Sequence, residues 1–442
     1  MKRALILAYD FPPYTSVGAL RPHNWYLYLK EFGIEPVVVT RQWNTAKNNA
    51  LAYVAPSEST YTVQEDDEHG KILKTPYFPN LANKLLLKNG QNKNRIVRKA
   101  ISAVYEFLQF IAPAGPKYQI YKEAESYLLN NKVDVIIASG DPFILHTYAS
   151  KLSRKFKTPW IADYRDLWSQ DIGIQNKAGF KEWSGVFERK ALKTASAVTT
   201  VSSYLQHKIN SIQHKDIRII SNGFDENVIK GIRDEKKDPS KLVIGFAGSV
   251  YEWNPVDRFF ELIDGYLATR PELSLEINLY GINFDDKMKA LLESRPQLKS
   301  VVKIHPRLSY PRLMLELSKS DLLLLFNHYT LIGTKIFDYL GLRKQILFCY
   351  TDDAYSNKLK NEYFKFEEIE GLSNQEQEDL ITKTRSGYLV KNEEHLIEVL
   401  DECFATLNET GSIPCNSVDS DNYSRKKQTE KLAELIHDLT SA

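Results

Sequence analysis

The sequence predicts an α/β fold in which each half of the chain forms a parallel sheet with crossover helices. Short apolar runs of strand type recur throughout, and the segments between them are long enough for a helix. The 442 residues suit two or three domains, and 43% hydrophobic with 26% charged residues is typical of a folded globular chain. The expected strands cover residues 4–9, 36–40, 133–139, 160–162, 197–201 and 217–221 in the first half, and 242–247, 275–280, 301–305, 322–326 and 345–348 in the second.

A polar stretch without apolar periodicity separates the two halves. Residues 225–241 are rich in charged side chains and contain Pro239, as linkers often do. We therefore expect an N-terminal domain over 1–224, a linker over 225–241 and a C-terminal domain over 242–420. Apolar residues at helical spacing predict a final helix within 421–442 that packs back on the N-terminal domain.

The amino-acid composition limits the class of protein and the cellular compartment that are expected. A formal net charge of +2 is too small for a surface that binds nucleic acid, so no nucleic-acid partner is expected. Cys349, Cys403 and Cys415 lack metal-ligand spacing and suit a reducing compartment, so no metal site is expected. Asp10 and two prolines follow the first apolar run where a signal peptide would be cleaved, and no run reaches about 18 apolar residues. These features predict a cytoplasmic protein that is soluble or lies on a membrane surface.

Polar and glycine residues follow the first predicted strand, at the sheet edge where ligands bind in parallel sheets. Residues 10–13 form a proline-fixed loop that leads to Gly18, and a helix is expected to begin near Arg21 or Pro22. Such a loop lets backbone N–H groups and a helix N-terminus approach an anionic ligand. A plain turn between strand and helix explains the same residues equally well.

Titratable side chains follow two further strands of the first half. Asp141 and His146 follow one strand, while Asp163, Arg165 and Asp166 follow the next, so all five are expected at one edge of the sheet. A structural alternative stays open. In it Asp141 caps its helix, and His146 is a satisfied surface histidine. In the same alternative, Asp163 or Asp166 pairs with Arg165.

The second half carries a comparable pattern. Gly248 and Ser249 close its first strand, where small side chains would admit a phosphate group or merely allow a turn. A helix starting near Thr334 would present free N–H groups, with Lys335 as a point charge for phosphate. Asp338 lies one turn later and could accept hydrogen bonds from ribose hydroxyls. The alternative is a structural helix with an exposed lysine–aspartate pair.

The order of these motifs resembles the GT-B glycosyltransferases, and among them the family 4-like group of retaining enzymes that use nucleotide-sugars. The resemblance covers essentially the whole chain. It rests on LILAYDFPPYTSVGALR at the start, PWIADYRDLW in the middle, KTASAVTTVSSYL and IISNGFD before the linker, LVIGFAGSVYEWNP after it, and GTKIFDYLGLRKQIL near the end. It implies two Rossmann-like domains that face each other across a cleft.

The resemblance also implies roles for individual residues. Lys335 would contact the donor pyrophosphate, Asp338 the ribose, and the loop around Arg307 and Leu308 the base. Gly18 would let the loop of the first domain close over the donor phosphates. The implied donor-binding residues are Gly18, Gly248, Ser249, Arg307, Leu308, Gly333, Thr334, Lys335 and Asp338, and the implied catalytic residues on the acceptor side are Asp141, His146 and Asp166.

The implied activity is that of a metal-independent glycosyltransferase of the hexosyltransferase type, with no cofactor. It would move a sugar with retention from a nucleotide diphosphate sugar to a saccharide or lipid-linked saccharide, in cell-surface polysaccharide biosynthesis. Two departures from the family's sequence pattern leave other functions open. Thr330 replaces the first of the paired glutamates common in the family, and residues 250–254 lack the usual basic pair. The alternatives are a GT-B fold sugar-nucleotide epimerase and a non-catalytic partner subunit. A dehydrogenase is disfavoured because no glycine-rich dinucleotide fingerprint follows the first strand.

A basic stretch in the first half indicates a further partner. No acidic residue occurs between His69 and Tyr105, whereas eight basic residues do, with leucines at 85–87. Such a stretch over 71–99 can bind anionic lipid headgroups, which predicts peripheral association with the inner face of the cell membrane. The alternative is a solvated loop and helix that covers the domain. The eight are Lys71, Lys74, Lys84, Lys88, Lys93, Arg95, Arg98 and Lys99.

Overall fold

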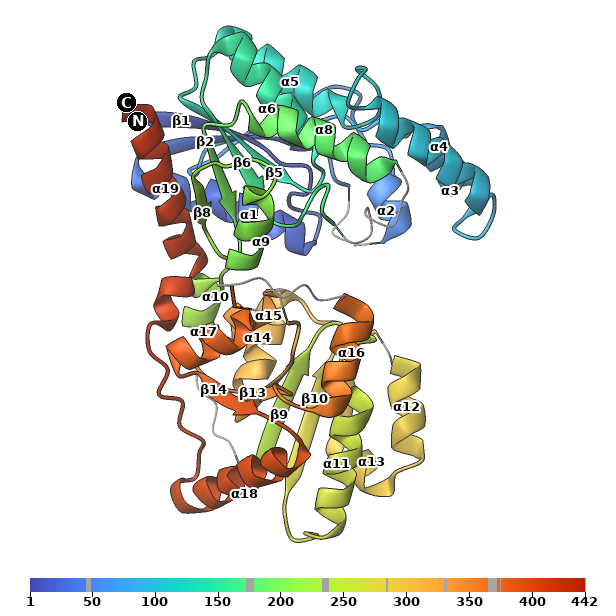
Figure 1. Ribbon diagram of the computed structural model, residues 1–442, viewed down its shortest axis with the longest axis vertical. Helices are drawn as coiled ribbons and strands as arrows, with labels where there is room; N and C mark the ends of the chain where they lie inside the picture. Colours follow the sequence, from blue (N-terminus) through green and yellow to red (C-terminus); the bar gives the residue numbers. More distant parts are fainter. Residues whose placement is uncertain are drawn as a thin grey trace. The chain divides into compact units, whose positions relative to one another are not determined.

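The chain folds into two compact units. The computed structural model describes residues 1–44, 49–171, 179–232, 238–283, 285–329, 332–364, 372–373 and 375–441. The first unit contains Met1–Ser221 and Lys426–Ala442, and the second contains Asn222–Arg425 (Figure 1). The expected linker over 225–241 contains helix α10 (Glu226–Lys230), which belongs to the second unit, while its residues 233–237 lie outside the described part.

The first unit is built on an eight-stranded sheet of order β3-β4-β2-β1-β5-β6-β7-β8. Neighbouring strands run parallel except β3 and β4, which pair antiparallel. All six strands expected in this half are present, with ends within two residues of the expected ones. The strands are β1 (Lys2–Leu7), β2 (Ile34–Arg41), β3 (Val63–Asp66), β4 (Lys71–Thr75), β5 (Val135–Gly140), β6 (Trp160–Tyr164), β7 (Ala197–Thr200) and β8 (Ile217–Ile219).

Both faces of this sheet are buried by helices. Side chains alternate between the two faces along each strand, so each strand contributes to both cores. Leu5 and Leu7 of β1 join the core on one face, with residues of α5, α6, α8 and α9. Ala4 and Ile6 join the core on the other face, with residues of α1 and α19. The helices are α1 (Val17–Tyr28), α2 (Ala50–Val54), α3 (Leu81–Asn89), α4 (Arg95–Leu108), α5 (Tyr118–Asn130), α6 (Ile144–Phe156), α8 (Phe180–Leu192), α9 (Ser203–Asn210) and α19 (Arg425–Ser441).

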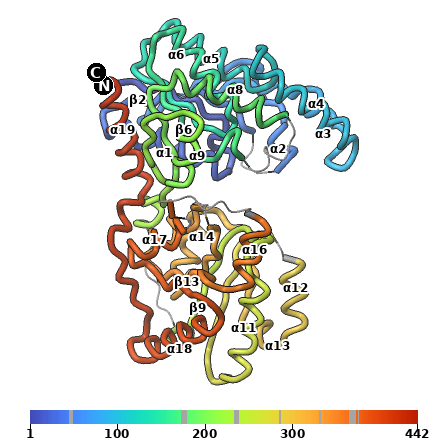
Figure 2. The backbone as a smooth tube through the Cα atoms, viewed as in Figure 1, coloured from blue at the N-terminus to red at the C-terminus, as the bar shows by residue number. Residues whose placement is uncertain are grey.

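The last helix, α19, lies against the first unit. Leu432, Leu435 and Ile436 are at most 1% exposed and belong to the same core as the residues of β1. Near the N-terminus, Lys2 donates from Nζ to the carbonyl of His437 at 3.2 Å. Figure 2 accordingly shows the two chain ends side by side in this unit.

The second unit is built on a parallel six-stranded sheet of order β11-β10-β9-β12-β13-β14. This is the doubly wound Rossmann order, with a switch point between β9 and β12 where the chain reverses its direction of progress. The first unit has the equivalent switch point between β1 and β5. The strands are β9 (Leu242–Ala247), β10 (Leu275–Tyr280), β11 (Val302–His305), β12 (Leu322–Phe326), β13 (Gln345–Cys349) and β14 (Gly387–Val390).

Helices cover both faces of the second sheet. Residues of α11, α12, α13 and α18 form the core on one face, and residues of α14, α15 and α17 form it on the other. The predicted α/β class with two parallel-dominated sheets is confirmed. Among the described residues, no helix is both long enough and apolar enough to span a membrane. The helices are α11 (Val256–Ala268), α12 (Asp285–Glu293), α13 (Pro296–Val301), α14 (Tyr310–Ser318), α15 (Lys335–Leu342), α16 (Ala354–Phe364), α17 (Glu376–Thr384) and α18 (Glu393–Thr410).

Candidate functional site

The switch point of the second unit brings together Ser249, which follows β9, and Lys335, the first residue of α15. The Nζ of Lys335 donates to the carbonyl of Ser249 at 2.8 Å and lies 4.5 Å from the centre of the Phe246 ring. Thr334 is the N-cap residue of α15, at the helix start expected from the sequence. The first N–H groups of a helix have no acceptor inside it, so this end combines free donors, a positive dipole end and an ammonium group.

Gly248 makes room for this lysine. Its φ of +82° is a left-handed conformation that residues with a side chain rarely adopt. A Cβ atom added there would lie 3.1 Å from Cε of Lys335. A glycine is therefore needed both for the turn after β9 and for the approach of the lysine.

The charge of Lys335 responds to its surroundings. Burial lowers the pKa of its amino group to about 7, because the protein around it solvates the ammonium form poorly. A bound anion would favour the ammonium form and raise this pKa again. An anion bound at this edge of the sheet would therefore stabilise the positive charge of Lys335 that attracts it.

Asp338 lies one turn further along α15 and already has a protein partner. The hydroxyl of Tyr310 donates to its Oδ1 at 2.6 Å. Burial raises the pKa of Asp338 to about 6, although the nearby charge of Arg425 and the tyrosine hydrogen bond act in the opposite direction. A ribose hydroxyl would therefore have to share this carboxylate with Tyr310.

The remaining donor-side residues lie at the same edge of the sheet. Arg307 and Leu308 follow β11, and the Arg307 side chain is exposed while Leu308 packs beside the core. Gly281, with φ of +61°, approaches Arg307 so closely that an added Cβ would lie 3.2 Å from its Cα. Gly333 precedes α15 and lies beside His328, whose Nδ1 would be 4.0 Å from an added Cβ. Thr330 lies outside the described residues.

An aromatic cluster at this edge was not expected from the sequence. Tyr251 and Trp253 stack with ring centres 4.5 Å apart and planes inclined by 4°. His328, two residues beyond β12, meets the Tyr251 ring edge-on at 5.2 Å, and Tyr363 lies near Trp253. Burial, and then the charge of Lys335, lower the pKa of His328 to about 4, so it is neutral at pH 7. The position of His328 just after a strand was the signal that could have identified it.

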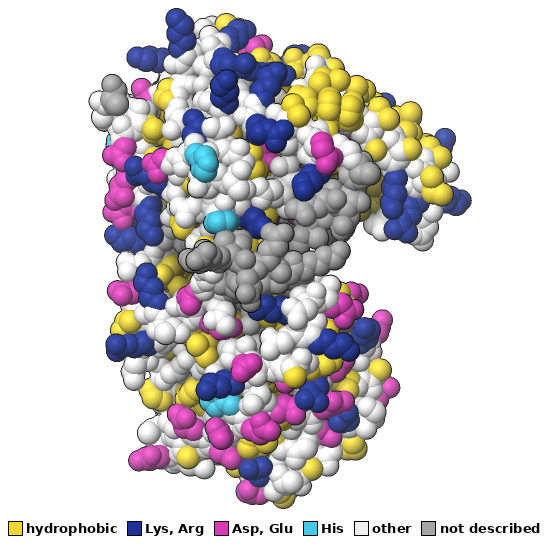
Figure 3. Space-filling model, in the orientation of Figure 1, with side chains coloured by type: hydrophobic (Ala, Val, Ile, Leu, Met, Phe, Trp, Pro, Cys, Tyr) yellow, Lys and Arg dark blue, Asp and Glu magenta, His cyan; other side chains and the backbone are white. Residues whose placement is uncertain are grey.

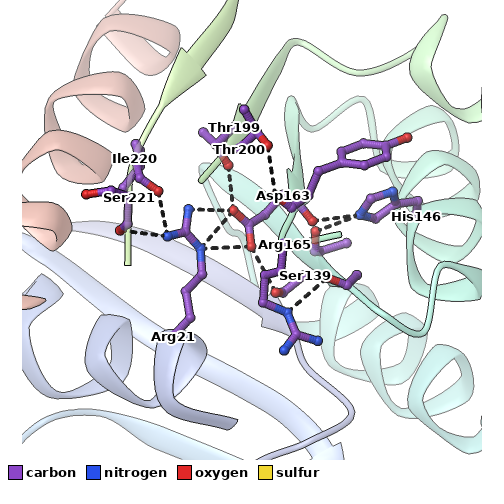
Figure 4. A network of polar contacts seen from close by, with 12 residues as sticks. Arg21, Ser139, His146, Asp163, Arg165, Thr199, Thr200, Ile220 and Ser221 are labelled. Atoms are coloured by element: carbon purple, nitrogen blue, oxygen red, sulfur yellow. Dashed lines mark hydrogen bonds and ion pairs between the residues drawn. The ribbon is translucent and has the colours of Figure 1, made fainter. Parts of the chain in front are cut away.

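The carboxyl edge of the first sheet is organised by a buried ion pair (Figure 4). Arg21 of α1 donates through Nη2 to Oδ1 of Asp163 at 2.7 Å, and their side chains are 5% and 0% exposed. Asp163 also accepts hydrogen bonds from the hydroxyls of Ser139 and Thr199. The suggested pairing of Asp163 with Arg165 is therefore wrong, because Arg21 occupies that position.

The expected helix start near Arg21 or Pro22 is also wrong, because α1 begins at Val17. The hydroxyl of Ser16 caps it by accepting from the N–H of Ala19 at 3.1 Å. Gly18 thus lies in the first turn of the helix, where a Cβ would come within 2.2 Å of Nη1 of Arg165. The observed role of this glycine is to let the guanidinium lie against the helix.

The three expected catalytic residues have different surroundings. Asp141 and Asp166 are exposed at this edge, and desolvation by neighbouring groups raises the pKa of Asp166. His146 is fully buried, and its Nε2 lies 3.1 Å from the carbonyl of Ala138 and 3.2 Å from that of Asp163. Burial lowers its pKa to about 4. It is therefore not a surface histidine, and an acceptor could reach it only if its neighbours moved.

Comparisons with known proteins support this picture at the level of fold. No family model matches the chain, and no curated protein matches its sequence. Sucrose-phosphate synthase from Thermosynechococcus elongatus has a similar structure, with a TM-score of 0.58, 11% identity and 100% of both chains covered. The catalytic domain of starch synthase IV from Arabidopsis thaliana, bound to ADP and acarbose, gives a TM-score of 0.56 at 13% identity over 100% of this chain and 99% of the other.

A third similar structure carries the description of a UDP-N-acetylglucosamine 2-epimerase from Listeria monocytogenes, with a TM-score of 0.51 and 12% identity over 99% of this chain and 96% of the other. These likenesses extend over the whole chain and both sheets. The chain therefore has the GT-B fold, in which two Rossmann-like units follow each other along the sequence.

Proposed function

We propose that this protein is a glycosyltransferase of the family 4-like, retaining type that uses a nucleotide diphosphate sugar as donor. The observation that carries the proposal is the hydrogen bond of 2.8 Å between Lys335 and the carbonyl of Ser249 at the switch point of the second unit. It fixes a cation, a glycine turn and a helix N-terminus at the position where doubly wound sheets bind phosphate groups.

In this proposal the donor pyrophosphate replaces the Ser249 carbonyl as the main partner of the Lys335 ammonium. The backbone around Gly248 and Thr334 supplies N–H donors, and Asp338 accepts from the ribose. Arg307, which is exposed after β11, would contact the base. The stacked Tyr251 and Trp253 take the place of the basic pair common in the family, so an aromatic face is available to the transferred sugar.

The proposed chemistry requires no metal ion. The acceptor oxygen forms a bond to the anomeric carbon while the bond from this carbon to the phosphate oxygen breaks. The bonding electron pair stays on the phosphate oxygen, which takes the proton of the acceptor hydroxyl. Lys335 and the N-terminus of α15 stabilise the charge that develops on the leaving diphosphate, and such preorganised electrostatics supplies most of the rate. Loss of activity on chelation that manganese restores would contradict this part.

On the acceptor side, we propose that Asp141 and Asp166 orient a saccharide or lipid-linked saccharide by accepting hydrogen bonds from its hydroxyls. Both are exposed at the carboxyl edge of the first sheet. A lipid-linked acceptor belongs to cell-surface polysaccharide assembly at the inner face of the cell membrane. Within the basic stretch over 71–99, the exposed lysines and arginines beyond β4 would then contact anionic headgroups, whereas Lys71 and Lys74 of β4 pair with Asp66 and Glu65.

Two experiments test the proposal. Thermal-shift measurements against uridine, guanosine and adenosine diphosphate sugars should give a higher melting temperature for at least one donor, because a ligand of the native state stabilises it. Lys335→Ala should abolish the shift, whereas Lys299→Ala, at an exposed position of α13, should retain it. Absence of any shift across the panel would favour a non-catalytic partner subunit.

Analysis of the reaction products distinguishes glycosyl transfer from the remaining alternative, epimerisation of the sugar-nucleotide. The best donor should yield a glycoside when acceptor saccharides are present. A free, altered sugar without glycoside would identify a sugar-nucleotide epimerase, the activity named in the description of one similar structure.

A further inference from the structure

Helix α4 presents an apolar face to solvent. None of its 14 residues is buried. Ile96 is 84% exposed, Val97 53% and Val104 56%. Phe107, Leu108 and Ile111, which follows the helix, are also exposed. A helix that covered the domain would turn these side chains inward, so the solvated covering helix considered from the sequence is not what α4 forms.

The exposed apolar side chains share one side of the helix. Positions 96, 97, 104, 107 and 108 fall within a single arc at 3.6 residues per turn, with Ala100 between them. The opposite side carries Arg95, Arg98, Lys99, Ser102 and Glu106. Strong segregation of this kind, with cations on the polar side, is typical of helices that lie in the headgroup region of a bilayer.

Helix α8 extends the apolar surface. Its Trp183 stacks on Phe107 with ring centres 3.8 Å apart and planes inclined by 12°. Val186, one turn along α8, is 51% exposed. Figure 3 shows hydrophobic side chains gathered along α4 and the neighbouring part of α8. Tryptophan suits the boundary between apolar and aqueous phases, because its ring is apolar and its N–H polar.

Basic side chains surround this surface. Lys84 and Lys88 of α3, Lys93 in the turn before α4, and Arg95 and Lys99 of α4 are all exposed. None of them pairs with a carboxylate within the described part of the chain. Residues 70–104 contain no acidic residue at all. The cations therefore remain available to an anionic partner.

We propose that the apolar face of α4, together with Trp183 and Val186 of α8, inserts into the headgroup region of an anionic lipid bilayer. The surrounding lysines and arginines would bind the lipid phosphates, and two weak attractions of this kind together give stable binding. A second copy of this chain would bring the same cations together and is therefore a poorer occupant. The inference rests on the proposed function and extends its membrane contact from 71–99 to an apolar surface on two helices. Flotation with vesicles needs no donor, so its outcome is separate from that of the donor-binding experiments.

The test is flotation with lipid vesicles. The wild-type protein should float with vesicles of phosphatidylcholine and phosphatidylglycerol in equal amounts, and should stay in the soluble fraction with phosphatidylcholine alone. Val104→Asp should lower binding at least about tenfold, because it puts a charge in the apolar face. Ser102→Asp, on the opposite side of α4, introduces the same charge and should reduce binding much less.

The melting temperature and the donor thermal shift show whether a loss of vesicle binding reflects a loss of folding. Both variants should retain the wild-type melting temperature and the wild-type thermal shift with the donor, since Val104 is 56% exposed. Failure of the wild type to float, or equal binding by Val104→Asp and wild type, would overturn the proposal. So would a dimer of the wild type that Val104→Asp dissociates while neither protein floats, because the surface would then be a contact between copies.

Discussion

Arg21 and Asp163 form a buried ion pair that joins helix α1 to strand β6 in the first unit, with Nη2 and Oδ1 2.7 Å apart. The same guanidinium donates through Nη1 to the carbonyl of Ile220 at 2.7 Å, so it also holds the chain just after β8. One arginine thus ties together the first half of α1, the end of β6 and the segment that follows β8, all at the carboxyl edge of the sheet. The exposed Asp141 and Asp166 lie at an edge that this network keeps in place.

Replacement of Asp163 by asparagine should destabilise the first unit by about 3–5 kcal/mol, because Arg21 would keep its charge without a buried counter-charge. Urea unfolding followed by circular dichroism measures this change. Asp141→Asn removes a carboxylate from an exposed position and should change stability by less than about 0.5 kcal/mol. Equal effects of the two substitutions would show that the buried pair contributes no special stability.

Gly248→Ala should weaken donor binding by about tenfold or more, because the left-handed φ of +82° is strained for alanine and the new methyl group would press on Lys335. Gly265→Ala is the matched control. Gly265 lies inside α11 with open space around it, and alanine favours a helix, so this variant should gain about 0.5–1 kcal/mol of stability. Wild-type donor affinity of Gly248→Ala would show that the turn after β9 is not part of the site.

Asp338→Asn should increase stability at neutral pH while it weakens donor binding. The folded protein raises the pKa of Asp338 to about 6, above its ordinary value, so ionisation costs stability. This cost is absent below the ordinary carboxyl pKa of about 4, grows as the pH rises towards 6 and is complete above it. Asparagine avoids the cost, and the gain should be roughly 1–2 kcal/mol after allowance for partial exposure.

Unfolding of both proteins between about pH 4 and pH 8 measures this difference. The stability gap between Asp338→Asn and the wild type should be larger at the upper end of the range. A gap that shrinks as the pH rises would contradict the assigned shift.

Trp253→Ala should lower the affinity for an intact nucleotide-sugar about tenfold and leave the affinity for the free nucleoside diphosphate nearly unchanged, because the proposed contact of the aromatic stack is with the sugar. Isothermal titration with the best donor of the panel and with its diphosphate measures both values, and the diphosphate serves as the internal control. Equal losses for the two ligands would assign Trp253 to the nucleotide instead.

Most of the fold could be predicted from the sequence, because buried parallel strands are continuous apolar runs. Residues 242–247, 275–280 and 322–326 were expected as strands with the observed ends. Strand β3 was missed because three of its four residues are exposed and polar, so no apolar run marks it. Strand β14 was missed because it is only four residues long and mostly half-buried at the sheet edge.

The site could be predicted only in part. Strand ends give the positions of Lys335, Gly248 and Asp141, since topology alone brings them to the carboxyl edges. Partners that lie far apart in sequence, such as Arg21 and Asp163 or Trp253 and His328, depend on how helices and loops pack. The burial of His146 likewise depends on aromatic rings from strand β6, those of Trp160 and Tyr164, which no local pattern around His146 reveals.

The central claim is that Lys335 binds the pyrophosphate of the donor, and calorimetry near pH 8 tests it most directly. The Lys335 amine of the free protein, with a pKa of about 7, is mostly neutral at that pH, and a bound pyrophosphate would favour its ammonium form. The best donor of the panel should therefore bind with uptake of a proton, seen as a dependence of the binding heat on the ionisation enthalpy of the buffer. Lys335→Arg, whose guanidinium stays charged, should bind without this uptake. Donor binding by the wild type without proton uptake, or unchanged affinity of Lys335→Ala, would contradict the account.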